Sequence, residues 1–136
     1  MQRLNSTRPT LVFVYGTLRH GESNDITQHQ PRPLFMGRAS VPGRLYDLGE
    51  CPGLILDPAA RPVKGEVYAV AACLIPILDA IEDDLGIYFR VQVEVRMQDG
   101  ARLNCVLYEA GVAQILARPL IACGDWVTHR CATVPA

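Results

Sequence analysis

Hydrophobic and polar positions alternate most regularly in the second half of the chain. Residues 88–97 (YFRVQVEVRM) change between apolar and polar at almost every step, and residues 102–109 do the same after the polar turn Gln98-Asp99-Gly100. Alternation with a period of two places one set of side chains on each face of a strand, and a turn that contains Asp-Gly joins antiparallel neighbours. The pattern therefore predicts a β-hairpin over residues 88–109.

Shorter apolar runs predict further strands in the first half. They cover residues 10–15, 54–56 and 63–70, with two short extended pieces within 35–46 that break at Pro42-Gly43. Runs of four to eight apolar residues between turn signals are typical of buried strands. Pro and Gly interrupt regular structure, so Cys51-Pro52-Gly53 is predicted to be a turn.

Helical signals are fewer. Residues 73–84 fit a helix, and a short helical segment is expected after Val112, followed by a final loop that contains Gly124-Asp125-Trp126. Residues 16–33 are polar and predict a long loop with one short helical turn. Loops of this length in compact domains are often functional.

This order of elements indicates the fold class. Strands outnumber helices and do not alternate with them regularly, which favours an α+β domain around a curved sheet or small barrel. A length of 136 residues fits one domain. We expect residues 1–9 to form a flexible tail and residues 10–136 to form the single domain.

The predicted helix carries a candidate carboxylate. At about 100° per residue, Leu74, Ile77, Leu78, Ile81 and Leu85 form an apolar stripe, and Glu82 falls on the flank of that buried face. Asp79 and Asp83 lie further out. A carboxylate at such a position is either paired, for example with Arg90, or held in a partly dry pocket with a raised pKa.

The turn after the first strand is the second candidate feature. The run Leu11-Val12-Phe13-Val14 ends at Tyr15-Gly16-Thr17-Leu18, where a polar turn presents unpaired backbone N–H groups. The turn has neither a GK[ST] ending nor a GxGxxG pattern, so nucleotide binding is not indicated. Tyr88 follows Glu82 by six residues, and its hydroxyl is expected to reach the same pocket.

Composition narrows the classes of function. A net charge of −1 gives no basic excess for nucleic acid. The N-terminus lacks an apolar leader, and the longest apolar run, residues 67–78, is shorter than the roughly 20 residues that span a bilayer. We expect a cytoplasmic protein without membrane association. The five cysteines and three histidines lack metal-ligand spacing, so neither a metal nor another cofactor is expected.

Several segments, taken in order, resemble one known family. Any one match is weak, but they run in the same order over most of the chain. They are Val14-Tyr15-Gly16-Thr17-Leu18-Arg19 with Gly21 and Asn24, Gly43-Arg44-Leu45-Tyr46-Asp47, Pro52-Gly53-Leu54, Val63-Lys64-Gly65-Glu66-Val67-Tyr68, Leu78-Asp79-Ala80-Ile81-Glu82 with Tyr88-Phe89-Arg90, and Gly124-Asp125-Trp126. Together they resemble the gamma-glutamylcyclotransferase-like (AIG2-like) family.

The resemblance implies a small mixed β-barrel with flanking helices and a cavity that holds the Tyr-Gly-Thr-Leu turn. It also implies that Glu82 is the catalytic general acid and base. The sequence departs from the family pattern in two places. The family often has Gly directly after the Glu, whereas Asp83 and Asp84 follow here, and it often has an aromatic residue before Pro-Gly, where Cys51 stands here. Both departures concern substrate choice more than chemistry.

The reaction implied by the resemblance is intramolecular aminolysis of a small γ-glutamyl substrate to 5-oxoproline and a free amine, a lyase or acyltransferase type of step. Glu82 would move the proton, while Tyr15, Gly16, Thr17, Leu18 and Tyr88 would bind substrate. Three alternatives stay open: a non-catalytic small-ligand-binding domain, an enzyme of the same fold for another amide, and a hydrolase that uses Cys or Ser. The sequence does not indicate an oligomeric state or the amine half of the substrate.

Overall fold

The computed structural model describes residues 8–84 and 88–133. Most of the expected N-terminal tail (residues 1–7) and Leu85 of the expected apolar stripe lie outside the described residues. The strands are β1 (Thr10–Val14), β2 (Leu34–Asp47), β3 (Pro52–Leu56), β4 (Pro62–Val70), β5 (Tyr88–Met97) and β6 (Arg102–Ala110). The helices are η1 (Ile26–Gln28), η2 (Ala72–Leu74), α2 (Ile75–Asp84), α3 (Val112–Ile115) and α4 (Trp126–Thr133).

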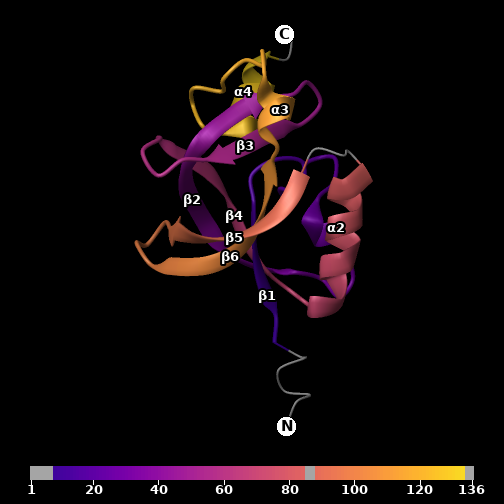
Figure 1. Cartoon of the computed structure of the whole chain (residues 1–136). Helices are drawn as coiled ribbons and strands as arrows, with labels where there is room; N and C mark the ends of the chain where they lie inside the picture. The colour runs from indigo at the N-terminus through magenta and orange to yellow at the C-terminus, as the bar shows by residue number, and fades with distance from the viewer. Residues whose placement is uncertain (1–7, 85–87, 134–136) are drawn as a thin grey trace.

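Five of these strands close into a barrel. Their order is β2-β4-β1-β6-β5, and β5 returns to β2 through the pairs Ala39–Met97 and Ser40–Arg96. β1 and β6 run parallel, whereas the other neighbours in the ring are antiparallel. Figure 1 shows the curved strands with helices around them. The predicted α+β fold, a small mixed β-barrel with flanking helices, is confirmed.

The long strand β2 corrects one prediction, because it does not break at Pro42-Gly43. Pro42 still pairs opposite Pro62 of β4, and from Gly43 onward the same strand pairs with β3. A Cβ on Gly43 would lie 2.6 Å from Leu54 Cδ1, so the glycine permits this close approach. The Pro-Gly pair marks a change of pairing partner. β3 also begins at Pro52, where the sequence predicted a turn.

The hairpin and the first helix are confirmed. β5 and β6 pair in register from Tyr88–Ala110 to Arg96–Arg102, as the alternation predicts. The expected helix over residues 73–84 is present as η2 followed by α2. The long loop over residues 16–33 contains one short helical turn, η1, also as predicted.

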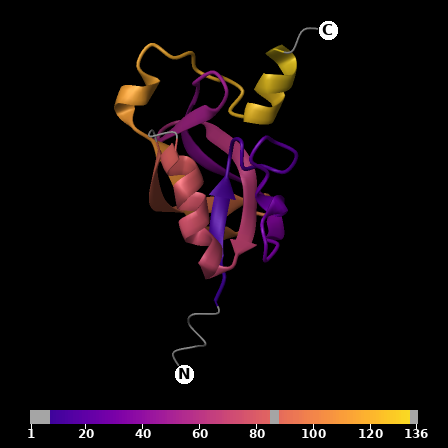
Figure 2. The same ribbon diagram turned by 90° about the vertical axis from the view of Figure 1, so that its right-hand side faces the viewer.

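Two hydrophobic clusters hold the domain together. One fills the barrel and includes Phe13, Tyr15 and Leu107, and the other lies between the barrel wall and α2. Alternation along β1 divides its side chains between the two clusters, so α2 packs alongside β1 (Figure 2). Ile77 is 46% exposed, which removes it from the predicted apolar stripe; the buried line runs along Leu74 and Leu78.

The final segment corrects another prediction, because α4 begins where a loop was expected. The Asp125 carboxylate accepts hydrogen bonds from the Val127 and Thr128 N–H groups at 3.1 and 3.4 Å, so it caps the helix. Trp126 packs into the barrel cluster. Both α3 and α4 lie at one end of the barrel (Figures 1 and 2). No helix within the described ranges is long and apolar enough to cross a membrane.

Candidate active site

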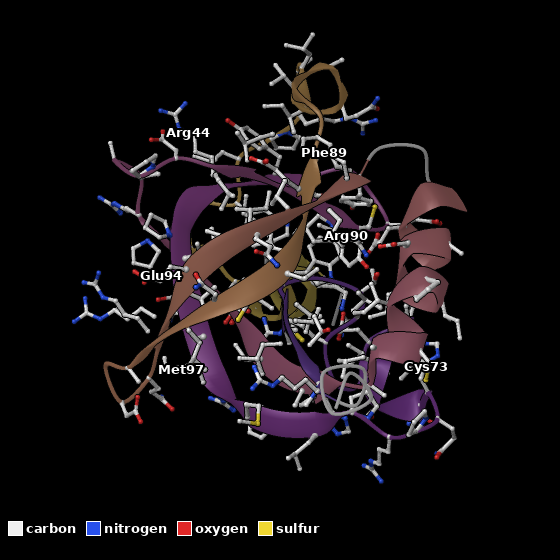
Figure 3. All side chains as sticks on the ribbon, turned by 60° about the horizontal axis from the view of Figure 1, so that its bottom comes forward. Arg44, Cys73, Phe89, Arg90, Glu94 and Met97 are labelled. Atoms are coloured by element: carbon white, nitrogen blue, oxygen red, sulfur yellow. The ribbon has the colours of Figure 1, made fainter. Side chains whose placement is uncertain are left out.

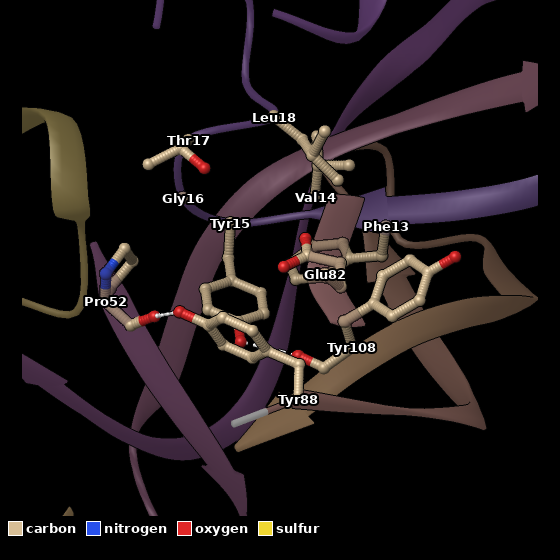
Figure 4. A pocket seen from close by; sticks show the side chains of 10 residues that line it. All are labelled: Phe13, Val14, Tyr15, Gly16, Thr17, Leu18, Pro52, Glu82, Tyr88 and Tyr108. Carbon is tan, nitrogen blue, oxygen red and sulfur yellow. Dashed lines mark hydrogen bonds between the residues drawn. The ribbon is translucent and has the colours of Figure 1, made fainter. Parts of the chain in front are cut away.

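A narrow cavity lies where the turn after β1 meets α2 and the β5–β6 hairpin (Figure 4). Its volume is about 20 Å³, room for about one water-sized group. The structure brings all of the predicted site residues to this cavity: Tyr15, Gly16, Thr17, Leu18, Glu82 and Tyr88. Segments far apart in the sequence therefore supply one site.

The turn that lines the cavity contains backbone N–H groups with no acceptor among the described residues. The Arg19 N–H donates to the Gly16 carbonyl at 3.0 Å, so Thr17 and Leu18 occupy the central positions of a β-turn. Within the described part of the chain, the N–H groups of these two central residues have no acceptor. A Cβ on Gly16 would lie 2.6 Å from the Pro52 ring, so this position requires glycine. The turn can bind an oxygen of a ligand.

The loop that follows holds the turn from behind. The Asn24 and Ile26 N–H groups donate to the Thr17 and Leu18 carbonyls, each at 2.9 Å. The Asn24 side-chain amide donates to Thr17 Oγ1 at 3.2 Å, which leaves the hydroxyl proton of Thr17 available. The donors of the turn are thus fixed before a ligand arrives.

Arg19 ties the same turn to the barrel and to α4. Its guanidinium bonds Glu66 Oε2 through Nε at 3.0 Å and Asp125 Oδ1 through Nη1 at 2.8 Å. Glu66 Oε1 also accepts from the His20 N–H at 3.1 Å and the Tyr68 hydroxyl at 2.8 Å. Burial acts to raise the pKa of Asp125, but the hydrogen bond and charge of Arg19, together with hydrogen bonds from Thr128, outweigh it and hold that pKa below its usual value.

Glu82 lies on the buried side of α2, one turn beyond Leu78, and is 8% exposed. No hydrogen bond or ion pair to its carboxylate is found among the described residues. The expected alternative partner, Arg90, binds Asp79 instead, at 2.9 Å. Burial raises the pKa of Glu82 to about 7. Of the two environments that the sequence left open for Glu82, the structure contains the partly dry pocket.

The two predicted tyrosines use their hydroxyl groups within the protein. Tyr15 Oη donates to the Tyr108 carbonyl at 2.5 Å and accepts from the Leu54 N–H at 3.3 Å. Tyr88 Oη donates to the Pro52 carbonyl. Burial raises the pKa of both phenols, and the Glu82 charge adds to the effect on each. Both tyrosines therefore present mainly their rings to the cavity.

Four further residues, which were not among the predicted site residues, line the cavity: Phe13, Val14, Pro52 and Tyr108. Tyr108 pairs opposite Arg90 in the hairpin, so counting back from the turn at residues 98–100 could have placed it beside the predicted site. Pro52 reaches the cavity only because β3 folds back on β2, and no local pattern signals that contact.

Two further kinds of reactive group are a metal-ligating cluster and a nucleophilic thiol. The described residues contain no group of three His, Cys, Asp or Glu side chains placed to hold a metal ion. Cys51 is the cysteine beside Tyr88, and burial raises the pKa of its thiol. A raised pKa disfavours the thiolate that a cysteine nucleophile requires.

The chain matches a family model described as gamma-glutamyl cyclotransferase, AIG2-like, over residues 12–128. It is 32% identical to the gamma-glutamylcyclotransferase family protein YtfP of Escherichia coli (strain K12) over 122 residues, which are 85% of this chain and 95% of that protein. It is 33% identical over 100 residues to the gamma-L-glutamyl-butirosin B gamma-glutamyl cyclotransferase of Niallia circulans, across 68% of this chain and 62% of that protein.

The fold also resembles a solved structure. The crystal structure of YkqA from Bacillus subtilis superimposes with a TM-score of 0.74 at 26% identity and covers 92% of this chain. This chain spans 42% of the YkqA chain. The similarity extends over nearly the whole barrel and its helices.

Proposed function

Since the chain belongs to the gamma-glutamyl cyclotransferase, AIG2-like family, we propose that it converts a γ-glutamyl amine or γ-glutamyl amino acid to 5-oxoproline and a free amine. The observation that carries the proposal is the buried Glu82 carboxylate beside the N–H groups of Thr17 and Leu18, all of which lack a partner among the described residues. A base and a set of oxygen-binding donors are the two requirements of this reaction.

The proposed reaction begins with a proton transfer to Glu82. The α-ammonium of the substrate gives one proton to the carboxylate, and the resulting amine attacks the γ-carbonyl carbon of the same molecule. The new C–N bond closes a five-membered ring and leaves a tetrahedral oxyanion. When the oxyanion collapses, the original amide C–N bond breaks, and protonated Glu82 returns the proton to the leaving nitrogen. The ring nitrogen then passes its second proton to the ionised Glu82 and on to the freed amine, so the products are a neutral lactam and an ammonium ion. Because attack occurs within one molecule, the protein mainly moves the proton and holds the folded conformer.

The turn has the complementary role in this proposal. The N–H groups of Thr17 and Leu18 bind a substrate oxygen, either the γ-carbonyl oxygen as it becomes an oxyanion or the α-carboxylate. A donor aimed at a developing oxyanion contributes roughly 3–4 kcal/mol of transition-state stabilisation. The ring of Tyr88 covers the cavity beside Glu82 and contributes to binding.

Replacing the carboxylate by an amide tests the proposal. Glu82→Gln keeps the shape of the side chain but cannot take a proton, so release of 5-oxoproline should fall by about 10²- to 10⁴-fold. The measurement is mass spectrometry of 5-oxoproline from a panel of γ-glutamyl amino acids and amines. Glu94→Gln is the matched control, because Glu94 is an exposed carboxylate paired with Arg102. An unchanged rate in Glu82→Gln would contradict the proposal.

Measurements of binding and turnover on the wild-type protein distinguish catalysis from binding alone. If γ-glutamyl compounds raise its melting temperature but no 5-oxoproline forms, the chain is a ligand-binding domain of the same fold. If 5-oxoproline forms and thiol alkylation abolishes turnover without unfolding the protein, a cysteine mechanism replaces the one proposed.

The pH dependence follows from the raised pKa. The first step needs ionised Glu82, so kcat/KM should rise with pH through about 7 and then level off. An ordinary exposed glutamate would already be ionised near pH 5. A pH–rate profile that is flat between pH 5.5 and 8 would remove Glu82 as the titrating base.

A further inference from the structure

A second hollow adjoins the cavity on the outer side of Glu82. Its volume is about 310 Å³, and it shares three of its lining residues, Glu82, Tyr88 and Tyr108, with the inner cavity. Asp79 of α2 and Phe89 and Arg90 of β5 complete its lining. Figure 3 shows Phe89 and Arg90 on the β5 strand beside α2. Glu82 therefore lies between a small space and a much larger one.

The two volumes limit how a substrate can lie. The inner cavity, about 20 Å³, has room for about one water-sized group, such as a single oxygen held by the turn. Proton return from Glu82 requires the leaving nitrogen to lie within about 3 Å of the same carboxylate. The glutamyl carbon chain next to that oxygen and the part of the substrate beyond that nitrogen must then both lie in the larger hollow.

The charged side chains that line the hollow are the Arg90 guanidinium and the carboxylates of Asp79 and Glu82. Arg90 Nη1 bonds Asp79 Oδ2 at 2.9 Å, while Asp79 Oδ1 accepts the Tyr108 hydroxyl proton at 2.7 Å. These contacts hold the guanidinium in place, and it is still 45% exposed. Its remaining N–H groups have no acceptor among residues 8–84 and 88–133. Phe89, which is 50% exposed, adds an apolar surface at the rim.

We propose that this hollow binds the amine half of the substrate, and that Arg90 selects amine halves that carry a carboxylate. The inference rests on the proposed function, because it assigns the leaving group of that reaction. A guanidinium presents its donors in a planar fork that matches a carboxylate. The ring of Phe89 favours an apolar side chain on the same group.

The test compares two ligands that differ only in that carboxylate, γ-glutamylphenylalanine and γ-glutamylphenethylamine. Binding is measured by calorimetry with Glu82→Gln, which does not depend on turnover, and kcat/KM is measured with the wild type. The carboxylated ligand should bind about 10-fold more tightly, the size of one partly exposed charge-assisted contact. The same preference should appear in kcat/KM.

Three further variants test the role of Arg90, and each is combined with Glu82→Gln for the binding measurements. They should respectively abolish, increase and leave unchanged the preference for the carboxylated ligand. Arg90→Gln should abolish the roughly 10-fold preference. Asp79→Asn removes the charge that opposes Arg90 but can still accept the Tyr108 proton, so the preference should increase. Arg102→Gln is the matched control, because Arg102 lies on the same hairpin and pairs with exposed Glu94, and it should leave the preference unchanged.

The outcomes separate the two proposals. If turnover occurs but the preference is absent, or survives Arg90→Gln in a folded protein, the assignment of Arg90 is overturned and the reaction stands. If the preference appears in binding but the wild type releases no 5-oxoproline from either ligand, the reaction is overturned and the carboxylate-binding hollow stands. If neither ligand binds, the assignment of the hollow to the amine half is overturned, and the panel of γ-glutamyl compounds decides the reaction separately.

Discussion

The two faces of the turn after β1 differ in whether their polar groups are paired. On one face, the N–H groups of Thr17 and Leu18 and the carboxylate of Glu82 lie together without partners in the described chain. On the other face, Arg19 is bonded to both Glu66 and Asp125. Adjacent residues thus belong to two different environments. The cavity face has polar groups without partners in the described chain, and the supporting face has polar groups that are all paired with one another.

This difference separates the motif residues by task. Buried polar groups are normally paired, since an unpaired one costs folding free energy. The supporting face follows that rule, whereas the cavity face departs from it where the proposed chemistry needs free donors and a base. Natural proteins commonly lose stability at such positions and regain it elsewhere. The comparison predicts that substitutions on the two faces change stability in opposite directions.

The largest change in stability should come from the supporting face. Arg19→Met leaves Glu66 and Asp125 without their shared cation, and losing one partner of a largely buried ion network costs roughly 3–5 kcal/mol of unfolding free energy. Urea unfolding at pH 7 measures this loss. Arg44→Met is the control, because Arg44 forms an exposed pair with Asp57 and should cost at most about 1 kcal/mol. Equal losses in the two variants would remove the distinction between the faces.

At Glu82 we expect a substitution to raise the unfolding free energy instead of lowering it. Its pKa is raised from 4.5 to about 7 by burial, so the folded state is stabilised by the protonated form and loses that stability as pH rises from about 4.5 through about 7. Glu82→Gln does not titrate. Its unfolding free energy relative to the wild type should therefore increase by roughly 3 kcal/mol between pH 4 and pH 8.

Denaturant unfolding at several pH values measures that difference, and Glu94→Gln serves again as the exposed control. A gap between Glu82→Gln and the wild type that stays constant with pH would mean that Glu82 titrates like a surface carboxylate. The cavity face would then not differ from the rest of the surface.

Local sequence patterns predicted several of the elements that form the cavity. Alternation placed the β5–β6 hairpin, and helical periodicity placed Glu82 on the buried flank of α2, because both depend only on near neighbours in sequence. The same argument misplaced Ile77, since the barrel contacts a narrower strip of the helix than the apolar residues cover. Family resemblance connected Glu82 with the turn, which periodicity alone could not do.

The remaining features depend on contacts distant in sequence. Closure of the barrel requires Ala39 to meet Met97, and the support of the turn requires Arg19 to meet Asp125. No local pattern specifies such pairs. The start of α4 was missed for another reason, because Val127 and Thr128 are β-branched and weak helix formers, and the cap at Asp125 was the only clear local signal.

A smaller effect is expected where the two faces meet at Tyr15. Its hydroxyl joins the Tyr108 carbonyl to the Leu54 N–H, so Tyr15→Phe removes two hydrogen bonds from a buried position. The loss should be about 1–3 kcal/mol of unfolding free energy. The change in KM, converted to free energy, should be smaller than this loss. Thermal and urea unfolding measure the first quantity, and 5-oxoproline kinetics the second. A large rise in KM without loss of stability would assign the Tyr15 hydroxyl to the substrate instead.

The smallest effect tests whether the Thr17 hydroxyl belongs to the cavity face. Asn24 donates to Thr17 Oγ1, which leaves the Thr17 proton free to reach a ligand. Thr17→Val keeps the shape and the backbone N–H but removes that proton, so kcat/KM should fall about 3- to 10-fold, the value of one hydrogen bond. Thr17→Ser restores the hydroxyl and should recover most of the rate. If Thr17→Val only lowers the melting temperature, the hydroxyl serves the Asn24 contact and belongs to the supporting face.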